Sequence, residues 1–72
     1  MNVTVVYMLQ HANESRAEEL SMDIVKDGQY YPIPRVGELV DTGQSVATVK
    51  LVEYLYGRGM QRKVVVVLVP NQ

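Results

Sequence analysis

The sequence contains no cysteine and a single histidine, His11, among its 72 residues. A disulfide is therefore excluded, and a structural zinc site is not expected because it needs a cluster of cysteine and histidine ligands. A chain this short buries only about 60% of the surface that its unfolded form exposes. We predict a single domain, residues 1–72, that binds no metal or cofactor and is stabilised by tight packing or self-association.

The chain also lacks a long apolar run. The longest, VVVVLV at 64–69, is far shorter than the ~20 residues of a membrane span. Met1 is not followed by the basic and apolar regions of a secretion signal. The absence of cysteine is compatible with the cytosol. These features favour a soluble, cytoplasmic protein with no membrane partner.

Recognisable catalytic motifs are missing as well. His11 stands alone in a polar turn, and no serine has a nucleophile elbow around it. The glycines at 57 and 59 lack the rest of a phosphate-binding or dinucleotide-binding fingerprint. Without an assembled acid, base and nucleophile, the sequence predicts a protein that is not an enzyme.

Short runs rich in β-branched residues dominate what is present. In 2–10, Val3, Val5, Tyr7 and Leu9 share one face at period two. Alternating or apolar runs separated by turn residues predict four more strands, at 19–25, 37–42, 45–57 and 64–70. Five short strands with turns every ten residues or so indicate an all-β fold, a small five-stranded antiparallel SH3-like or partly open barrel.

The segment 14–25 has two interpretations. Ser15 and Glu18 have the spacing of a capping box, which favours one short helix near 14–20. Leu20, Met22 and Ile24 alternate with polar residues, which favours a strand that forms a hairpin with 2–10. We favour the strand, with a helix packed on the sheet as the alternative.

The stretch YYPIPRVGELV, 30–40, is the most distinctive. Its two prolines donate no backbone hydrogen bond and hold the residues before them extended, so the segment predicts a stiff rod that leads into a strand at Gly37. The alternative is a ledge that binds a partner protein. The candidate partner-binding residues, here and in the later 45–57 run, are Tyr30, Tyr31, Arg35, Tyr54 and Tyr56.

A family resemblance rests on the same stretch. The segment Pro34-Arg35-Val36-Gly37-Glu38 is followed by Val40, a polar turn, Val46 or Val49, Val52 with Tyr54, and a closing valine-rich strand. This pattern, over roughly 31–69, resembles small SH3-like β-barrel proteins of bacterial and phage genomes. The resemblance implies a fold, and together with the small size it suggests a phage- or mobile-element-encoded accessory or inhibitor protein.

The turn YGRGMQRK, 56–63, concentrates positive charge. Arg58, Arg62 and Lys63 have no acid nearby and follow Tyr54 and Tyr56, which is a pattern that can meet phosphates and stacked bases. A solvated hairpin end that discourages edge aggregation is the other interpretation. The net charge of −1 is not that of a general nucleic-acid binder, so nucleic-acid binding is the alternative function rather than the first.

The run VVVVLV bears on partners because it is apolar on both faces. A strand with one solvent-facing side should alternate apolar and polar residues. Here Val65, Val67 and Val69 form one face, and the residues of the other face are equally apolar. Either 14–25 packs over the outer face or a second subunit does, and we favour a homodimer. The sequence thus predicts a non-enzymatic small binding module that contacts another protein and self-associates.

Overall fold

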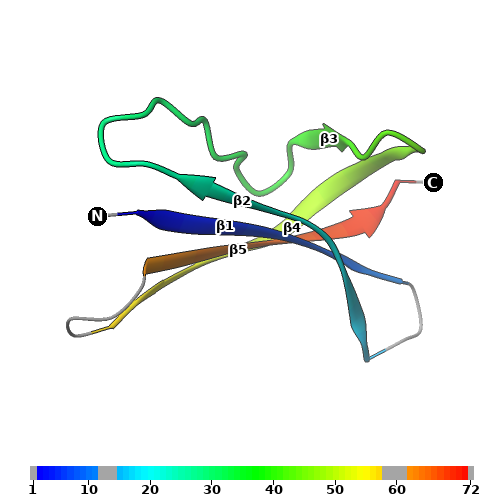
Figure 1. Ribbon diagram of the computed structural model, residues 1–72. Helices are drawn as coiled ribbons and strands as arrows, with labels where there is room; N and C mark the ends of the chain where they lie inside the picture. The colour runs from blue at the N-terminus through cyan, green and yellow to red at the C-terminus, as the bar shows by residue number, and fades with distance from the viewer. Residues whose placement is uncertain (1, 12–14, 58–61, 72) are drawn as a thin grey trace.

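The computed structural model describes residues 2–11, 15–57 and 62–71. These residues form five strands and no helix: β1 (Val3–Gln10), β2 (Ala17–Val25), β3 (Leu39–Asp41), β4 (Val46–Tyr56) and β5 (Arg62–Pro70). They make one sheet in the order β2-β1-β5-β4-β3 (Figure 1). The predicted all-β class with five strands is confirmed.

Two sequence predictions are resolved by this sheet. The segment from Ala17 to Val25 is a strand that pairs antiparallel with β1, so a helix over the described part of 14–20 is wrong. The expected antiparallel sheet is mixed instead, because β1 and β5 run parallel while the other neighbouring pairs run antiparallel. Strands β4 and β5 form the predicted long hairpin.

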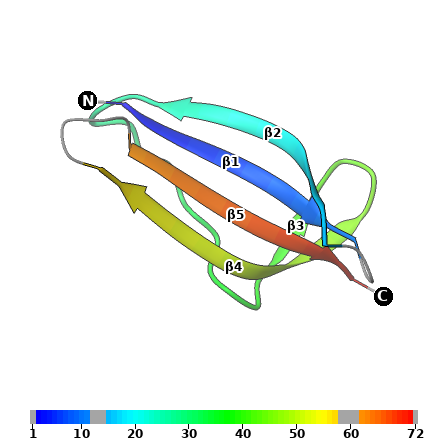
Figure 2. The ribbon, with the colours of Figure 1, turned by 90° about the horizontal axis from the view of Figure 1, so that it is seen from below.

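The sheet is strongly curled into a half-barrel, which gives it an inner and an outer face. The loop 26–38 and β3 lie over the inner face, above the other strands in Figure 1. Seen from below in Figure 2, β2, β1, β5 and β4 have no described segment in front of them. The described residues contain no helix long and apolar enough to cross a membrane.

The hydrophobic core lies on the inner face. Period-two alternation directs Val5 of β1 and Val64, Val66 and Leu68 of β5 inward, and each of them is essentially fully buried. From β4, Ala47 and Val49 complete the core. Tyr31, Ile33 and Val40 pack against it from above, so the loop 26–38 and β3 cover what the curled sheet does not.

An irregularity in β4 changes which side chains face inward. Val49 lies opposite Leu68 and Leu51 opposite Val67, so Lys50 is an extra residue that shifts the register. Strict alternation would place Leu51 and Leu55 with the core residues of β4, but the shift turns both outward. It turns Val52 inward instead, where it packs against the core. A second irregularity in β2, at Leu20, has the same effect on that strand.

The proline-rich stretch lies outside the sheet, as its missing donors predicted. The chain enters the sheet at Gly37, whose φ of 93° lies in the left-handed region that favours glycine. Two backbone bonds then anchor it to β4: Gly37 N–H donates to the Val49 carbonyl and Val49 N–H to the Glu38 carbonyl, each at 2.9 Å. The third strand is shorter than the predicted 37–42.

Candidate functional site: the mouth between β2 and β3

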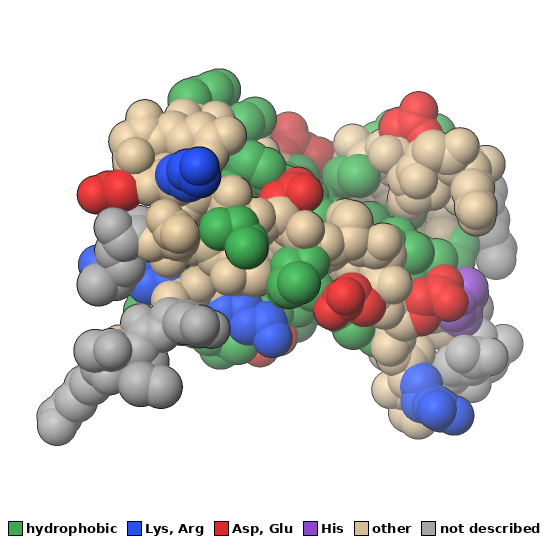
Figure 3. All heavy atoms as spheres, viewed as in Figure 1, with side chains coloured by type: hydrophobic (Ala, Val, Ile, Leu, Met, Phe, Trp, Pro, Cys, Tyr) green, Lys and Arg blue, Asp and Glu red, His purple; other side chains and the backbone are tan. Residues whose placement is uncertain are grey.

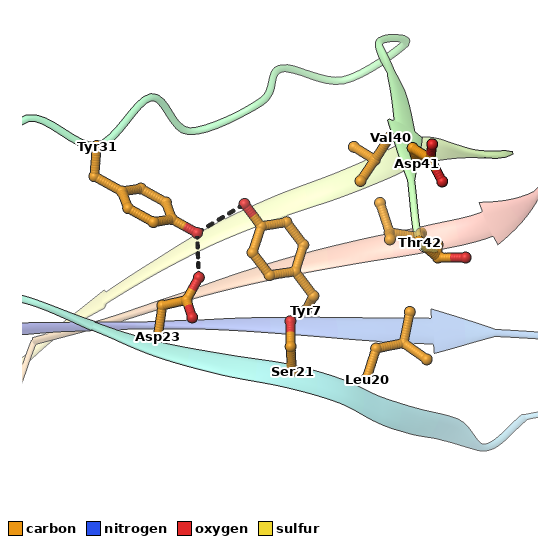
Figure 4. A pocket seen from close by; sticks show the side chains of 9 residues that line it. Tyr7, Leu20, Ser21, Asp23, Tyr31, Val40, Asp41 and Thr42 are labelled. Atoms are coloured by element: carbon orange, nitrogen blue, oxygen red, sulfur yellow. Dashed lines mark hydrogen bonds between the residues drawn. The ribbon is translucent and has the colours of Figure 1, made fainter. Parts of the chain in front are cut away.

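The half-barrel is open between its two end strands, and a cleft of about 300 Å³ lies in this opening, which we call the mouth. Its walls come from β2 on one side and from β3 and the loop before it on the other (Figure 4). Its apolar floor includes Leu68 of the core, with Val40 and Leu20 at the sides. Leu68 itself is only 1% exposed, so the accessible apolar surface of the mouth comes from the partly buried Val40 and the exposed Leu20.

A hydrogen-bonded tyrosine spans the mouth. The Tyr31 hydroxyl lies 2.8 Å from Oδ2 of Asp23 and 3.0 Å from the hydroxyl of Tyr7 (Figure 4). A hydroxyl has one proton, and the carboxylate is the stronger acceptor, so Tyr31 donates to Asp23 and accepts from Tyr7. These bonds tie the proline-rich loop to β1 and β2 at one end of the cleft.

The environment of Tyr31 keeps its hydroxyl neutral. Partial burial disfavours the phenolate, and the bond to Asp23 needs the proton. Both effects raise the pKa of Tyr31 above its ordinary value. Tyr31 is therefore a hydrogen-bonding group at neutral pH and not a proton-transfer group.

The charges around the mouth are acidic. Asp23 and Asp41 line the main cleft, and Glu18 lines a neighbouring cleft that also includes Leu9 and Thr42. Among the described residues that line the two clefts, none is a lysine or an arginine. Figure 3 shows acidic and apolar side chains interleaved on the face that carries β2. The mouth is suited to a ligand that combines apolar groups with positive charge.

Strand β2 forms a free edge beside this cleft. It is at one end of the sheet and pairs with β1 alone. It is nine residues long, and all but its last residue are exposed. An edge strand presents unpaired N–H and C=O groups on its open side, which another extended chain can bind. β2 contains no proline or lysine that would blunt this edge.

The predicted partner-binding residues do not form one cluster. Tyr31 is at the mouth, but Tyr30 is 86% exposed and Arg35 is exposed on the far part of the loop. The backbone N–H of Arg35 donates to the carboxylate of Glu38, which closes the turn before β3. Of the three residues in the stretch, only Tyr31 contributes to the cleft.

Tyr54 and Tyr56 lie at the other end of the sheet. Opposite Val64 and Arg62, they face the inner side beyond the core, and both are more than half exposed. Their rings meet edge to face at 6.1 Å, and the Arg62 guanidinium lies 5.5 Å from the Tyr56 ring. Lys63 is opposite Leu55 on the outer face, and Arg58 falls outside the described residues.

The predicted self-association residues occupy the outer face as expected from their alternation. Val65, Val67 and Val69 are half-buried there. They lie among apolar residues of the neighbouring strands, and Met22, Ile24, Leu51 and Leu55 are 44–61% exposed. We call this set, with Val6 and Met8 of β1, the outer patch.

Of the residues that line the mouth, only Tyr31 was singled out from the sequence as a site residue; Tyr7, Asp23 and Asp41 are among those that were missed. The alternation in 2–10 correctly placed Tyr7 on one face of a strand with Val5 and Leu9. It did not show that the Tyr7 hydroxyl bonds to Tyr31. The available signal was Asp23, an acid on the inner side of β2 opposite the core residue Val5. Nothing in the local sequence pairs it with Tyr31.

The described residues contain no group of three histidine, aspartate or glutamate side chains placed to hold a metal ion. No family model matches the chain. The searches of curated proteins and of solved structures likewise found no match. The mouth, the β2 edge and the outer patch are therefore the features from which a function can be inferred.

Proposed function

We propose that this chain is a small, non-enzymatic protein-binding module that holds an extended segment of a partner protein in the mouth. The observation that carries the proposal is the free edge of β2 beside a cleft with an apolar floor. Addition of a strand to an exposed sheet edge is a common mode of peptide recognition, in which backbone bonds give affinity and side-chain pockets give specificity.

The space available fits this mode. The sheet curls far enough to bring β2 and β3 to opposite sides of one cleft, but the two strands are not paired. A segment bound along β2, at the end of the cleft away from the Tyr31–Asp23 bond, would extend the sheet toward β3 and direct alternate side chains toward Leu20 and Val40. The bound segment would remove from water the apolar surface that the open half-barrel leaves accessible.

The charge of the mouth selects among extended segments. Glu18 and Asp23 face the inner side of β2 and Asp41 lies at the rim of the cleft, so a segment with lysine or arginine at alternate positions would be attracted and an acidic one repelled. The same acids disfavour pairing of β2 with β2 of another copy, because like charges would meet across the new ladder. The partner at this edge is thus a basic segment of a different protein.

Three synthetic peptides of equal length test the proposal. They are an alternating Lys-Val peptide, an alternating Glu-Val peptide, and the Lys-Val peptide with one central proline. In two-dimensional amide NMR, the Lys-Val peptide should shift resonances of β2 and of the mouth, and it should protect β2 amides from hydrogen exchange. The Glu-Val and proline peptides should bind at least tenfold more weakly.

Two variants on the same strand sharpen the test. Glu18→Gln removes a charge from the inner side of β2 and should weaken binding of the Lys-Val peptide, whereas Glu19→Gln removes a charge from the outer side of β2 and should not. Equal binding of all three peptides, or shifts that map away from β2, would refute strand addition at this edge.

A nucleic-acid-binding function is the second candidate. It is favoured by the exposed pair of Tyr54 and Tyr56 with Arg62 over the Tyr56 ring, because aromatic and guanidinium planes can stack on bases. So few cations would give weak binding that is strongly salt-dependent. Titration of short single-stranded oligonucleotides at two salt concentrations tests this function, and no binding at low salt would dismiss it.

A further inference from the structure

The outer face of the sheet has no cover within the described part of the chain. The one segment that could have packed over it, 14–25, contributes β2 to the sheet itself. The valines of β5 on this face are half-buried, and side chains of the adjacent strands cover the rest of their surface. Val6 lies between Met22 and Val65 and is only 3% exposed. An apolar centre therefore exists on the outside of the molecule.

Exposed apolar side chains flank this centre on both sides. Met22 and Ile24 of β2 are 56% and 61% exposed, and Leu51 and Leu55 of β4 are 44% and 49% exposed. Contiguous apolar surface of this kind marks an interaction site rather than a solvated face. The irregularity at Lys50 contributes directly, because without it both leucines would face the core side.

The shape of the patch suits a second convex surface. Two convex faces approach most closely at their centres and diverge toward their edges. Here the outer-patch side chains of the central strands β1 and β5 are valines except for Met8, and those of the flanking strands are the longer methionine, isoleucine and leucine. The flanking side chains can therefore fill the space that opens on either side of the central contact.

The charges on this face match those of a second copy. Glu19 lies opposite Met8, Glu53 opposite Val65, and Lys63 opposite Leu55, so all three face outward. Lys50 joins them, because its Nζ donates to Oε1 of Gln10 at 3.1 Å across β5. Across β2, β1, β5 and β4, the described residues of the outer face thus carry two acids and two bases, and two such surfaces can meet without net repulsion.

The available area is also sufficient. The two longer extents of the molecule are 38 and 24 Å, which bounds the face at roughly 900 Å², close to the ~800 Å² that each partner buries in a standard interface. An interface of standard size would therefore use most of the outer face. A second copy of the same shape and curvature can cover that much surface, whereas a small ligand cannot.

We infer that two copies of this chain pack back to back through the outer patch, as a homodimer with twofold symmetry. In this arrangement the sheets form a sandwich whose inner faces point away from each other. The two mouths then open on opposite sides of the dimer. If the proposed function is correct, the dimer is a bivalent module that bridges two partner segments, with avidity that neither mouth has alone.

Two charge variants test the dimer without altering the core. Lys50→Glu with Lys63→Glu makes the outer face wholly acidic, and Glu19→Lys with Glu53→Lys makes it wholly basic. By sedimentation equilibrium, the wild-type chain should have twice its mass of 8.1 kDa. Each variant alone should be monomeric, and an equimolar mixture of the two should restore the dimer.

A matched control separates the outer face from total charge. Arg16→Glu with Lys26→Glu changes the net charge by the same amount as the acidic variant, but both positions lie on exposed segments outside the strands that form the patch. This control should remain dimeric. Circular dichroism should show a wild-type sheet spectrum for every variant.

A wild-type chain that is monomeric up to millimolar concentration would overturn the inference. So would a mixture of acidic and basic variants that fails to associate, or charge variants that dimerise as the wild type does. These measurements use no peptide, so they can fail while the mouth still binds one. Conversely, a dimer that binds no peptide would refute the proposed function and leave the back-to-back packing intact.

Discussion

The two faces of β5 provide a direct test of the fold, because its four successive valines, 64–67, alternate in direction between the two faces. Val66 faces the core between Tyr7 and Val52 and has no exposed surface, whereas its neighbour Val67 lies half-buried on the outer face. Replacing either by alanine removes the same atoms from the same central strand. The loss of β-propensity is then equal, and the difference reports packing alone.

The magnitudes follow from burial. At Val66, two buried methyl groups are worth about 1.6 kcal/mol of transfer free energy, and the cavity left among rigid neighbours adds about 1 kcal/mol. At Val67, a half-buried site without a closed cavity should lose about 0.5–1 kcal/mol. A domain of this length has a free energy of unfolding of only ~4–11 kcal/mol, so the first change removes a large fraction of it.

Urea denaturation followed by circular dichroism measures the loss in free energy of unfolding for each variant, and thermal unfolding followed by the same signal measures the melting temperature. Both are done at a dilution at which the wild-type chain sediments as a monomer. Val66→Ala should lower the melting temperature by about 10–20 °C, and Val67→Ala by about 2–8 °C. At concentrations at which the dimer forms, the cost of Val67→Ala should rise, because the dimer covers that side chain. Equal costs at both positions under dilute conditions would refute the assignment of inner and outer faces.

The mouth, the loop and the surface give further tests. Tyr31→Phe should cost about 1–2 kcal/mol in urea unfolding. The pKa of Tyr31 is raised in the fold, so the native state holds the hydroxyl proton more tightly than the unfolded chain does. The resulting contribution to the free energy of unfolding is complete below pH ~10 and is lost as the pH rises further. Tyr31→Phe should abolish this part of the pH dependence. Gly37→Ala should cost about 1–2 kcal/mol, because φ is 93° there. Glu18→Ala should change stability by less than ~0.5 kcal/mol, because its contact with His11 is exposed.

The local pattern predicted the strands and the inner faces of β1 and β5, because alternation and turn residues act within a few positions. It did not predict the parallel pairing of β1 with β5, since residues about sixty positions apart choose partners through the whole fold. Strict alternation misassigned Leu51 and Leu55 for a related reason. An extra residue at Lys50 shifts the register, and the only trace in the sequence is the adjacent apolar pair Leu51 and Val52.

The residues of the mouth were least predictable because they come from three separate segments. Tyr7 is on β1, Asp23 on β2 and Tyr31 in the loop, and they meet only after the sheet has curled. Of these, the sequence singled out Tyr31, through its position before Pro32. Tyr30, Tyr54 and Tyr56, the other tyrosines predicted to bind a partner, do not line the mouth. The sequence therefore identified one side chain of the site but not the site itself.

The openness of the half-barrel has a cause in the same stretch. A sheet of this kind closes when its end strands pair, and here those strands are β2 and β3. Strand β2 is long, but β3 has three residues. It cannot be extended regularly toward its N-terminus, because the chain turns at Gly37 and Pro34 and Pro32 donate no backbone bonds. The residues that end the sheet on one side therefore leave the edge of β2 unpaired on the other. The proposed binding site is thus a consequence of where the prolines stop the barrel from closing.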